Sequence, residues 1–264
     1  MAESGIEIRE CTAVEEFDQC VRLQREAFGL PDLELSPRRH LIVARSAGGF
    51  TLGAFDGVRM VGFVLNQVAA RRAPETGADE IIGYSHMMAV AKDYQNRGVG
   101  ARLKWAQRAR TLAQGRRFIR WTWDPAQSRN AHFNINRLGV VVRGYAENYY
   151  GTDYSTVPGR FAETLGLDSD RLVAEWDLDS PRVEALARGE TPGPLGEPAA
   201  SVTIPPNWGA LVAEDPAAAR AELLRVRGGF RAAFDAGLVC AGFDRDPSAP
   251  RYLFFDGSKL DVQS

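Results

Sequence analysis

Residues 95–101 read Gln95-Asn96-Arg97-Gly98-Val99-Gly100-Ala101 and stand between an apolar run, Ile81 to Val90, and a segment from 102 to 114. In that later segment apolar residues recur every three or four positions, which predicts an amphipathic helix. Glycines at a helix start let consecutive backbone N–H groups turn toward one point, where the helix dipole adds positive potential. The segment therefore favours a pyrophosphate-binding loop that joins a buried strand to a helix.

Two widespread phosphate-binding motifs do not fit this loop. A Walker loop requires Gly-Lys followed by Ser or Thr, and no such triplet follows the glycines. A dinucleotide fingerprint, GxGxxG, fails because Leu103 occupies the place of the third glycine. A helix-start loop whose glycines serve only the turn stays open as an interpretation.

Predicted strands and helices surround the loop in an α/β order. The runs Phe50 to Phe55 and Met60 to Leu65 are joined by Asp56-Gly57, a pair typical of a tight hairpin. Apolar alternation and β-branched content predict further strands, and helical spacing predicts the helices. The strands are expected at 6–9, 81–90, 118–123, 140–150, 171–176, 238–243 and 252–255, and the other helices at 15–28, 128–137, 180–188 and 217–234.

The loop in this setting resembles the Gln/Arg-x-x-Gly-x-Gly/Ala motif of the GNAT (Gcn5-related N-acetyltransferase) superfamily. The resemblance covers roughly Ile6 to Gly151: Met87 to Val90 matches the fourth strand, and Asn130-Ala131 with Leu138-Gly139-Val140 matches a downstream region in altered spacing. It implies an α/β GNAT acyl-CoA N-acyltransferase fold, with a mixed central sheet flanked by helices, over residues 1–155. Residues 156–264 would form a C-terminal α+β extension, for which a degenerate second GNAT-like unit is one interpretation.

The activity that the resemblance implies is transfer of an acetyl or other short acyl group from acyl-CoA to the amine of a small molecule, by direct attack in a ternary complex and without a metal. The pattern Arg129 to Asn134, with Tyr149-Tyr150-Gly151, looks like a poorly characterised bacterial branch, some members of which are associated with succinyl transfer to amino acids. A succinyl-CoA-dependent amino-acid N-succinyltransferase is therefore one alternative. A catalytically silent CoA-binding module is another.

The same resemblance assigns the acyl-CoA site to the fourth strand and the glycine loop. The strand backbone would pair with the pantetheine arm, and the loop would hold the phosphates, with Arg102 and Lys104 as further candidates for phosphate charge. The expected cofactor-binding residues are Met88, Ala89, Val90, Gln95, Asn96, Arg97, Gly98, Val99, Gly100, Ala101 and Asn130.

Catalysis needs a base for the amine proton and an acid for the departing thiolate. His86 precedes the expected thioester position and is the candidate base, and regular alternation would place it on one strand face with Met88 and Val90. The alternative interpretation of His86 is a hydrogen-bonded core histidine. Glu80 is a second candidate base, which could act through water. The tyrosine that the family often carries three residues before Leu-Gly is replaced by Ile135. Tyr149 and Tyr150 are substitutes, and we select Tyr150 as the candidate acid.

Composition limits the partners. The 264 residues are 45% hydrophobic with a formal net charge of −2, so the chain lacks the positive field that drives unspecific nucleic-acid or anionic-membrane binding. Cys11, Cys20 and Cys240 are scattered without a metal-binding or disulfide pattern. With no apolar leader or membrane-length run, we expect a cytoplasmic protein with a small-molecule acceptor. The C-terminal part could serve as a lid or as the contact of a homodimer.

Overall fold

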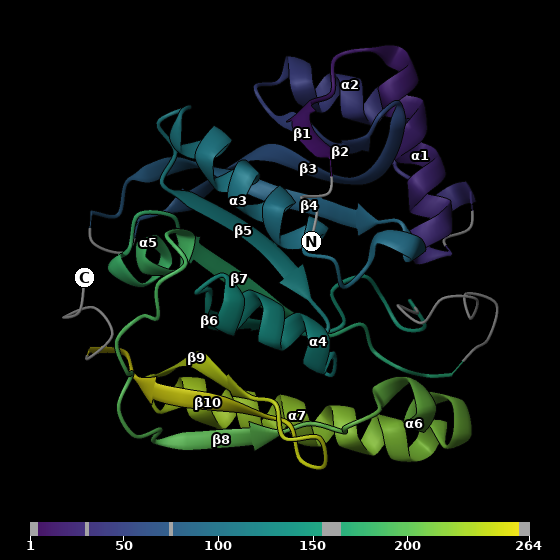
Figure 1. The fold of residues 1–264 in the computed structure, drawn as a ribbon. Helices are drawn as coiled ribbons and strands as arrows, with labels where there is room; N and C mark the ends of the chain where they lie inside the picture. The colour runs from purple at the N-terminus through teal and green to yellow at the C-terminus, as the bar shows by residue number, and fades with distance from the viewer. Residues whose placement is uncertain (1–4, 30–31, 74–75, 155–164, 259–264) are drawn as a thin grey trace. The chain divides into compact units, whose positions relative to one another are not determined.

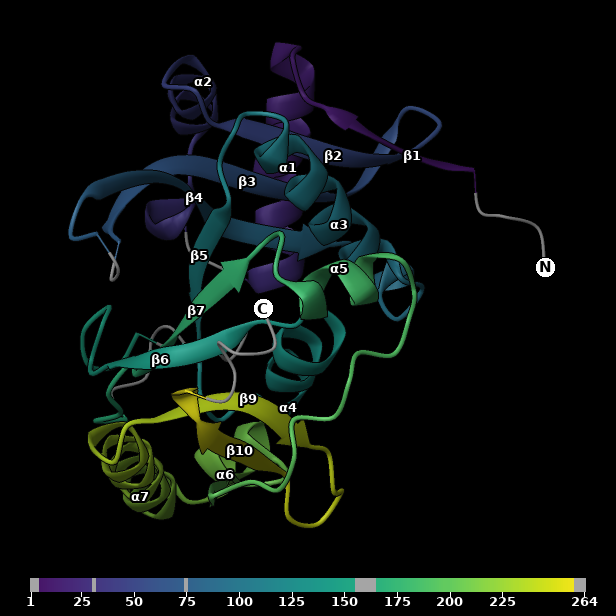
Figure 2. The same cartoon turned by 90° about the vertical axis from the view of Figure 1, so that its left-hand side faces the viewer.

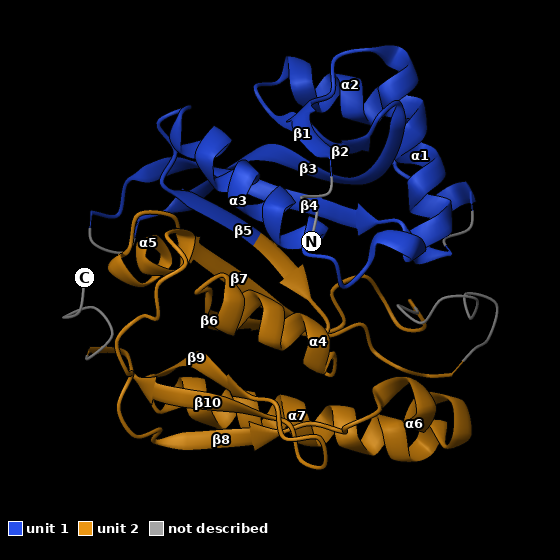
Figure 3. Ribbon diagram, viewed as in Figure 1, with its two compact units in different colours: residues 1–120 blue, residues 121–264 orange. Residues whose placement is uncertain are grey.

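The computed structural model describes residues 5–29, 32–73, 76–154 and 165–258 (Figure 1). The chain divides into two compact units, Met1–Arg120 and Trp121–Ser264 (Figure 3). This division falls inside a strand, Phe118–Trp123. The boundary expected between residues 155 and 156 lies outside the described residues, and the extent of the two domains stays a prediction.

The first unit is a mixed sheet with helices on both faces (Figures 1 and 2). Its strands follow the order β1-β2-β3-β4-β5, antiparallel except for the parallel pair β4 and β5. The elements are β1 (Ile6–Glu10), α1 (Val14–Phe28), a 3₁₀ turn (Asp32–Glu34), α2 (Arg38–Ser46), β2 (Phe50–Asp56), β3 (Arg59–Arg72), β4 (Asp79–Val90), a 3₁₀ turn (Lys92–Tyr94), α3 (Val99–Leu112) and β5 (Phe118–Trp123).

Two hydrophobic clusters lie on opposite faces of this sheet. On one face Phe17 and Leu23 of α1 pack with Phe63 of β3, and on the other Val99 and Leu103 of α3 pack with neighbouring strand residues. Gly62 of β3 allows α3 to pack close to the strand, because glycine has no Cβ. A Cβ at this position would lie only 3.1 Å from Leu103 Cδ1 and 3.2 Å from Val99 Cγ1. This close packing fixes the start of α3, and with it the glycine loop, beside β4.

The second unit continues with antiparallel strand pairs in the order β7-β6-β9-β10-β8. Phe230 of α7 contacts Tyr252 and Phe254 of β10 in this unit's core. The elements are α4 (Ser128–Ala131), a π-helical turn (His132–Arg137), β6 (Val141–Ala146), β7 (Arg171–Asp177), α5 (Pro181–Ala187), β8 (Ala200–Thr203), α6 (Trp208–Glu214), α7 (Pro216–Asp235), β9 (Leu238–Asp244) and β10 (Arg251–Asp256).

Most predicted elements are confirmed, with a few corrections. The strand expected to reach Tyr150 ends at Ala146, because residues 147–150 form a turn. The helix expected over 128–137 is a short α-helix followed by a π-helical turn. Helix α6 and strand β8 were not predicted. No helix within the described ranges combines the length and apolar content needed to span a membrane.

Candidate active site

The glycine loop has the backbone shape that its sequence predicts. Asn96 and Gly98 have φ angles of 60° and 81°, in the left-handed region, and Gly98 caps the N-terminus of α3. A Cβ at Gly98 would meet nothing within 4 Å, so the space beside it is open. Gly100 lies over β4, where a Cβ would make ordinary contact with Met88 Cε at 3.4 Å. The left-handed turn and the start of a 14-residue helix together suit an anionic ligand.

The approach to the loop is anchored to the β2–β3 turn. Arg59 donates to Asp93 at 2.8 Å, and Tyr94 donates to Asp56 at 2.5 Å. The Gln95 side chain donates to the Val90 carbonyl at 3.2 Å, which closes the turn between β4 and the loop. Arg97 is exposed, with its guanidinium 5.3 Å from the centre of the Tyr94 ring.

The two other basic residues considered for phosphate charge are engaged elsewhere. Arg102 Nη2 donates to the Ile6 carbonyl at 2.6 Å. Lys104 is buried, and its Nζ donates to Ser85 Oγ at 2.8 Å and to Gln107 Oε1 at 3.1 Å. Arg97 is therefore the basic residue of this segment that best fits a phosphate role.

Strand β4 carries a β-bulge at His86. Leu65 of β3 pairs with Met87 and Asn66 pairs with Ser85, so His86 is the extra residue between two consecutive partners. The bulge changes the alternation of side chains. Met88 and Val90 pack toward α3, whereas Met87 and Ala89 pack toward α1.

His86 therefore does not share a face with Met88 and Val90, and the expectation from regular alternation is wrong. Its imidazole turns to the α1–α2 side of the sheet, where Nε2 lies 3.2 Å from Ser36 Oγ. The ring also meets His40 edge to face, with centroids 5.2 Å apart. His40 Nε2 in turn lies 2.6 Å from Gln67 Nε2. We call these four side chains, Ser36, His40, Gln67 and His86, the histidine cluster.

The surroundings of His86 favour its neutral form. Although the residue keeps contact with solvent, desolvation by its neighbours and the nearby His40 lower the pKa of His86 to about 4. At pH 7 the imidazole is then unprotonated and able to accept a proton.

The other candidate base, Glu80, lies at the far end of β4, where it is ion-paired with Arg71 at 2.9 Å.

The ladder between β4 and β5 is short. It consists of the pairs Gly83 with Ile119 and Tyr84 with Arg120. Within the described part of the first unit, the edge of β4 from 85 to 90 that faces away from β3 is not taken up by a strand partner. An extended ligand can therefore hydrogen-bond with the backbone of these residues, directly before the glycine loop.

A second polar cluster lies on the α3 side of the same strand. Gln107 Nε2 donates to Asn66 Oδ1 at 2.9 Å, and both side chains are fully buried together with Ser85 and Lys104. Burial lowers the pKa of Lys104 to about 7. The burial of this lysine between helix and sheet gave no signal in the sequence, because residue 104 reads as one more exposed base on an amphipathic helix.

Two expected site residues belong to the second unit. Tyr150 lies in the turn after β6, half-exposed, with its ring 4.7 Å from that of Tyr154 and its N–H donating to Ser169 Oγ at 2.7 Å. Asn130 is exposed on α4. Within the first unit, Met88 and Val90 thus lie beside the loop 95–101, whereas the imidazole of His86 lies on the α1–α2 side of the sheet. The parts assigned to Tyr150 and Asn130 stay predictions.

Comparison with known proteins identifies the domain. Residues 17–139 match the family described as acetyltransferase (GNAT) family. No curated protein matches the chain. Similar solved structures include the ribosomal-protein-S18-alanine N-acetyltransferase from Escherichia coli (14% identity, 66% of this chain and 94% of that one, TM-score 0.49). Another is Chaetomium thermophilum Naa20 in complex with a bisubstrate analogue (14% identity, 65% and 86%, TM-score 0.49).

A third similar structure is an aminoglycoside acetyltransferase, meta-AAC0020, from an uncultured soil metagenomic sample (18% identity, 44% of this chain and 76% of that one, TM-score 0.38). The matched family segment, 17–139, spans α1 to the π-helical turn and contains the bulged strand and the glycine loop. The chain therefore contains a segment, residues 17–139, that belongs to the acetyltransferase (GNAT) family.

Proposed function

We propose that the chain transfers an acetyl group from acetyl-CoA to the amine of a small molecule. The observation that carries the proposal is the juxtaposition, inside the matched domain, of the bulged strand β4 with the loop at the start of α3. The unpaired edge of β4 suits the amide-rich pantetheine arm, and the open space beside Gly98 suits the phosphates. The residues proposed to hold acyl-CoA are 88–90 and 95–101.

The backbone at the bulge would supply the polarising group. A bulge leaves its extra residue, here His86, outside the ladder, so the backbone N–H of His86 can point toward the acyl carbonyl instead of toward β3. Such a donor is most effective where negative charge develops on the oxygen during attack. No side chain needs to form a covalent bond with the acyl group.

His86 is proposed to take the proton of the amine. The amine nitrogen bonds to the carbonyl carbon, the carbon–sulfur bond breaks, and the proton leaves the nitrogen as that nitrogen becomes acidic. An imidazole whose pKa is lowered to about 4 is neutral and ready at pH 7, although it is a weak base, so it must act at this stage and not on the free ammonium. Tyr150 is proposed to return a proton to the departing sulfur.

Two measurements test this function. Thermal unfolding with CoA, acetyl-CoA, succinyl-CoA and NAD tests binding, because a ligand at 100 times its dissociation constant adds about 2.7 kcal/mol. We expect a raised melting temperature with the CoA compounds and none with NAD. Thiol release from acetyl-CoA with a mixed pool of primary amines then tests turnover. Binding without turnover would support a silent CoA-binding module, and faster thiol release from succinyl-CoA would support the succinyl donor.

A further inference from the structure

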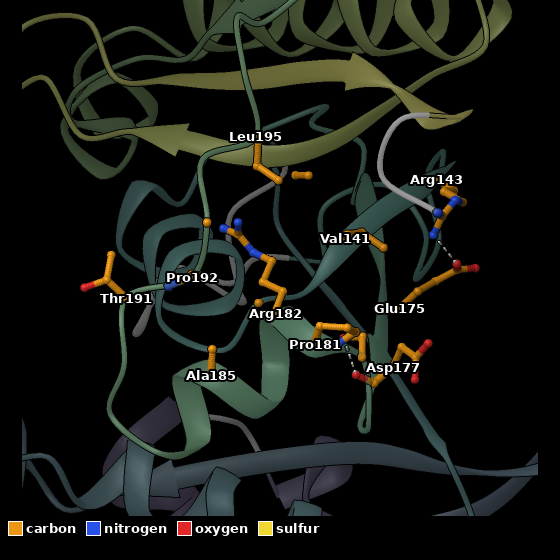
Figure 4. Close-up of a pocket in the computed structure, with 14 residues that line it drawn as sticks. Val141, Arg143, Glu175, Asp177, Pro181, Arg182, Ala185, Thr191, Pro192 and Leu195 are labelled. Atoms are coloured by element: carbon orange, nitrogen blue, oxygen red, sulfur yellow. Dashed lines mark hydrogen bonds and ion pairs between the residues drawn. The ribbon is translucent and has the colours of Figure 1, made fainter. Parts of the chain in front are cut away.

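The second unit contains a pocket that the acyltransferase proposal does not use. It lies between β6, β7, the start of α5 and the segment 191–195, and has a volume of about 260 Å³ (Figure 4). This is slightly less than the roughly 300–1,000 Å³ of ordinary ligand sites, so its occupant would be a small metabolite. Much of the wall is apolar, from Val141, Pro181, Ala185, Pro192 and Leu195.

Arg182 is the cation that lacks a counter-ion in this pocket. Figure 4 shows its side chain directed from α5 into the space between Val141 and the segment 191–195. Its Nε is buried and makes no hydrogen bond, and none of the described residues forms an ion pair with it. Burial lowers the pKa of Arg182, which still remains protonated because arginine is too basic to lose its proton in a protein. A guanidinium in this position calls for an anion with two oxygens, which can accept from two N–H groups at once.

The other charged groups narrow the ligand class. Arg143 in the wall is ion-paired with Glu175 at 3.3 Å, so these two charges offset each other. Asp177 also lines the pocket and adds a negative potential. The carboxylate of Asp177 disfavours a dianion such as phosphate, whereas a ligand with a single carboxylate can still pair with Arg182.

The wall that holds Arg182 is rigid. Gly139, with a φ of 75°, lets α5 pack closely, since a Cβ there would lie 3.1 Å from Val183 Cγ2 and 3.6 Å from Arg182 Cγ. Val183 is fully buried, and the buried Trp176 donates to the Leu138 carbonyl at 2.8 Å. The guanidinium is therefore held at the pocket by a packed stem, which reduces the entropy lost on binding.

We propose that this pocket binds a small monocarboxylate with an apolar body, its carboxylate paired with Arg182 and its body against Val141, Ala185 and Leu195. This site is independent of the proposed acyl transfer. Carboxylate binding to this pocket is measured on the full chain without acyl-CoA or an amine. Failure of either proposal therefore leaves the other unaffected.

The experiment is a two-dimensional amide NMR titration of the full chain with hexanoate, benzoate, benzamide and inorganic phosphate. We expect saturable shifts around 139–143 and 181–195 with a carboxylate, and none with benzamide or phosphate. Arg182→Gln should weaken carboxylate binding at least about tenfold, because a charge-assisted bidentate pair is lost. Ala185→Phe, which keeps every charge but fills the space, should abolish it. Arg188→Gln is the matched control, since Arg188 is exposed and paired with Glu190 at 2.8 Å.

Three results would overturn the proposal. The first is the absence of saturable shifts with either carboxylate up to about 10 mM. A dissociation constant above that concentration would be too weak for a specific small-molecule site. The second is equal binding of benzamide or phosphate. The third is unchanged binding in folded Ala185→Phe, a variant that stays informative if Arg182→Gln fails to fold.

Discussion

Lys104 Nζ donates to Ser85 Oγ at 2.8 Å, which ties the middle of α3 to the residue of β4 that precedes the bulge. The contact lies in a fully buried polar cluster that also contains Gln107 and Asn66. Buried polar networks specify one arrangement of their elements when every member is satisfied. This cluster therefore fixes how α3, and the glycine loop at its start, is aligned against the bulged strand.

The lysine in this cluster makes stability depend on pH. Its pKa is lowered to about 7 in the folded chain and is about 10.4 when unfolded. Between these values the unfolded state binds more protons, so stability rises with pH, by at most about 1.4 kcal/mol per pH unit. Lys104→Met removes the titrating group and should flatten this rise. Urea unfolding of both proteins at pH 7 and pH 9 measures it; equal slopes in wild type and variant would contradict the prediction.

Gly98 is the glycine of the loop that the backbone requires. Gly98→Glu places a negative side chain where we propose the phosphates lie, and it also adds about 1–2 kcal/mol of strain from the left-handed conformation. We expect the KM for acetyl-CoA to rise at least about tenfold in a folded protein. Gly98→Asn, which carries less of the same strain and no charge, separates the two effects, and Gly100→Ala should bind normally because its Cβ has room. Unchanged acetyl-CoA affinity in folded Gly98→Glu would remove the phosphate site.

Much of the first unit could be predicted from the sequence because its signals are local. The hairpin at Asp56-Gly57, the helix ending at Gly29 and the turn at Gly98 each depend on residues adjacent in the chain. The strand 118–123 was predicted with its observed bounds from aromatic and β-branched content alone.

The parts that were missed depend on contacts between distant segments. The bulge at His86 is a mismatch between two strands, so the sequence of β4 alone gives a regular alternation and places His86 on the wrong face. Ser36 reaches His86 across 50 positions of sequence, from a segment whose helix α2 had no strong pattern. Tyr150 was expected in a strand because tyrosine favours strands. The structure has a turn here instead. In this turn Asp170 accepts from the Asn148 N–H, and Ser169 accepts from the Tyr149 and Tyr150 N–H groups.

The histidine cluster predicts an unusual titration of His86. Desolvation and His40 lower the pKa of His86 to about 4, from the ordinary value near 6.5. Replacing His40 by Gln removes one of these causes, so the pKa of His86 should rise toward 6.5 in the variant. Imidazole NMR signals followed from about pH 3 to about pH 8 cover both midpoints. A midpoint of His86 near 6.5 in the wild type would contradict the lowering of its pKa by desolvation and by His40.

His86→Gln tests the proposed base. If His86 takes the amine proton, kcat should fall by about 10² or more while the KM for acetyl-CoA stays near its wild-type value. A positioning role predicts the opposite split, with a raised KM for the amine and little change in kcat. Ser36→Ala is the matched control, because it removes the 3.2 Å contact and leaves the imidazole in place. A kcat within twofold of wild type would exclude His86 as the base.

Tyr150 has a neighbour that makes its test sharp. Tyr149 and Tyr150 are exposed to nearly the same degree, 48% and 47%, and their rings touch with centroids 4.8 Å apart. If Tyr150 protonates the departing thiolate, Tyr150→Phe should lower kcat by about 10² with acetyl-CoA, and less with an acyl donor whose thiol leaves more easily. Tyr149→Phe should leave both rates unchanged. Steady-state rates with the two donors decide the matter, and equal losses in the two variants would mean that the pair serves packing and not proton transfer.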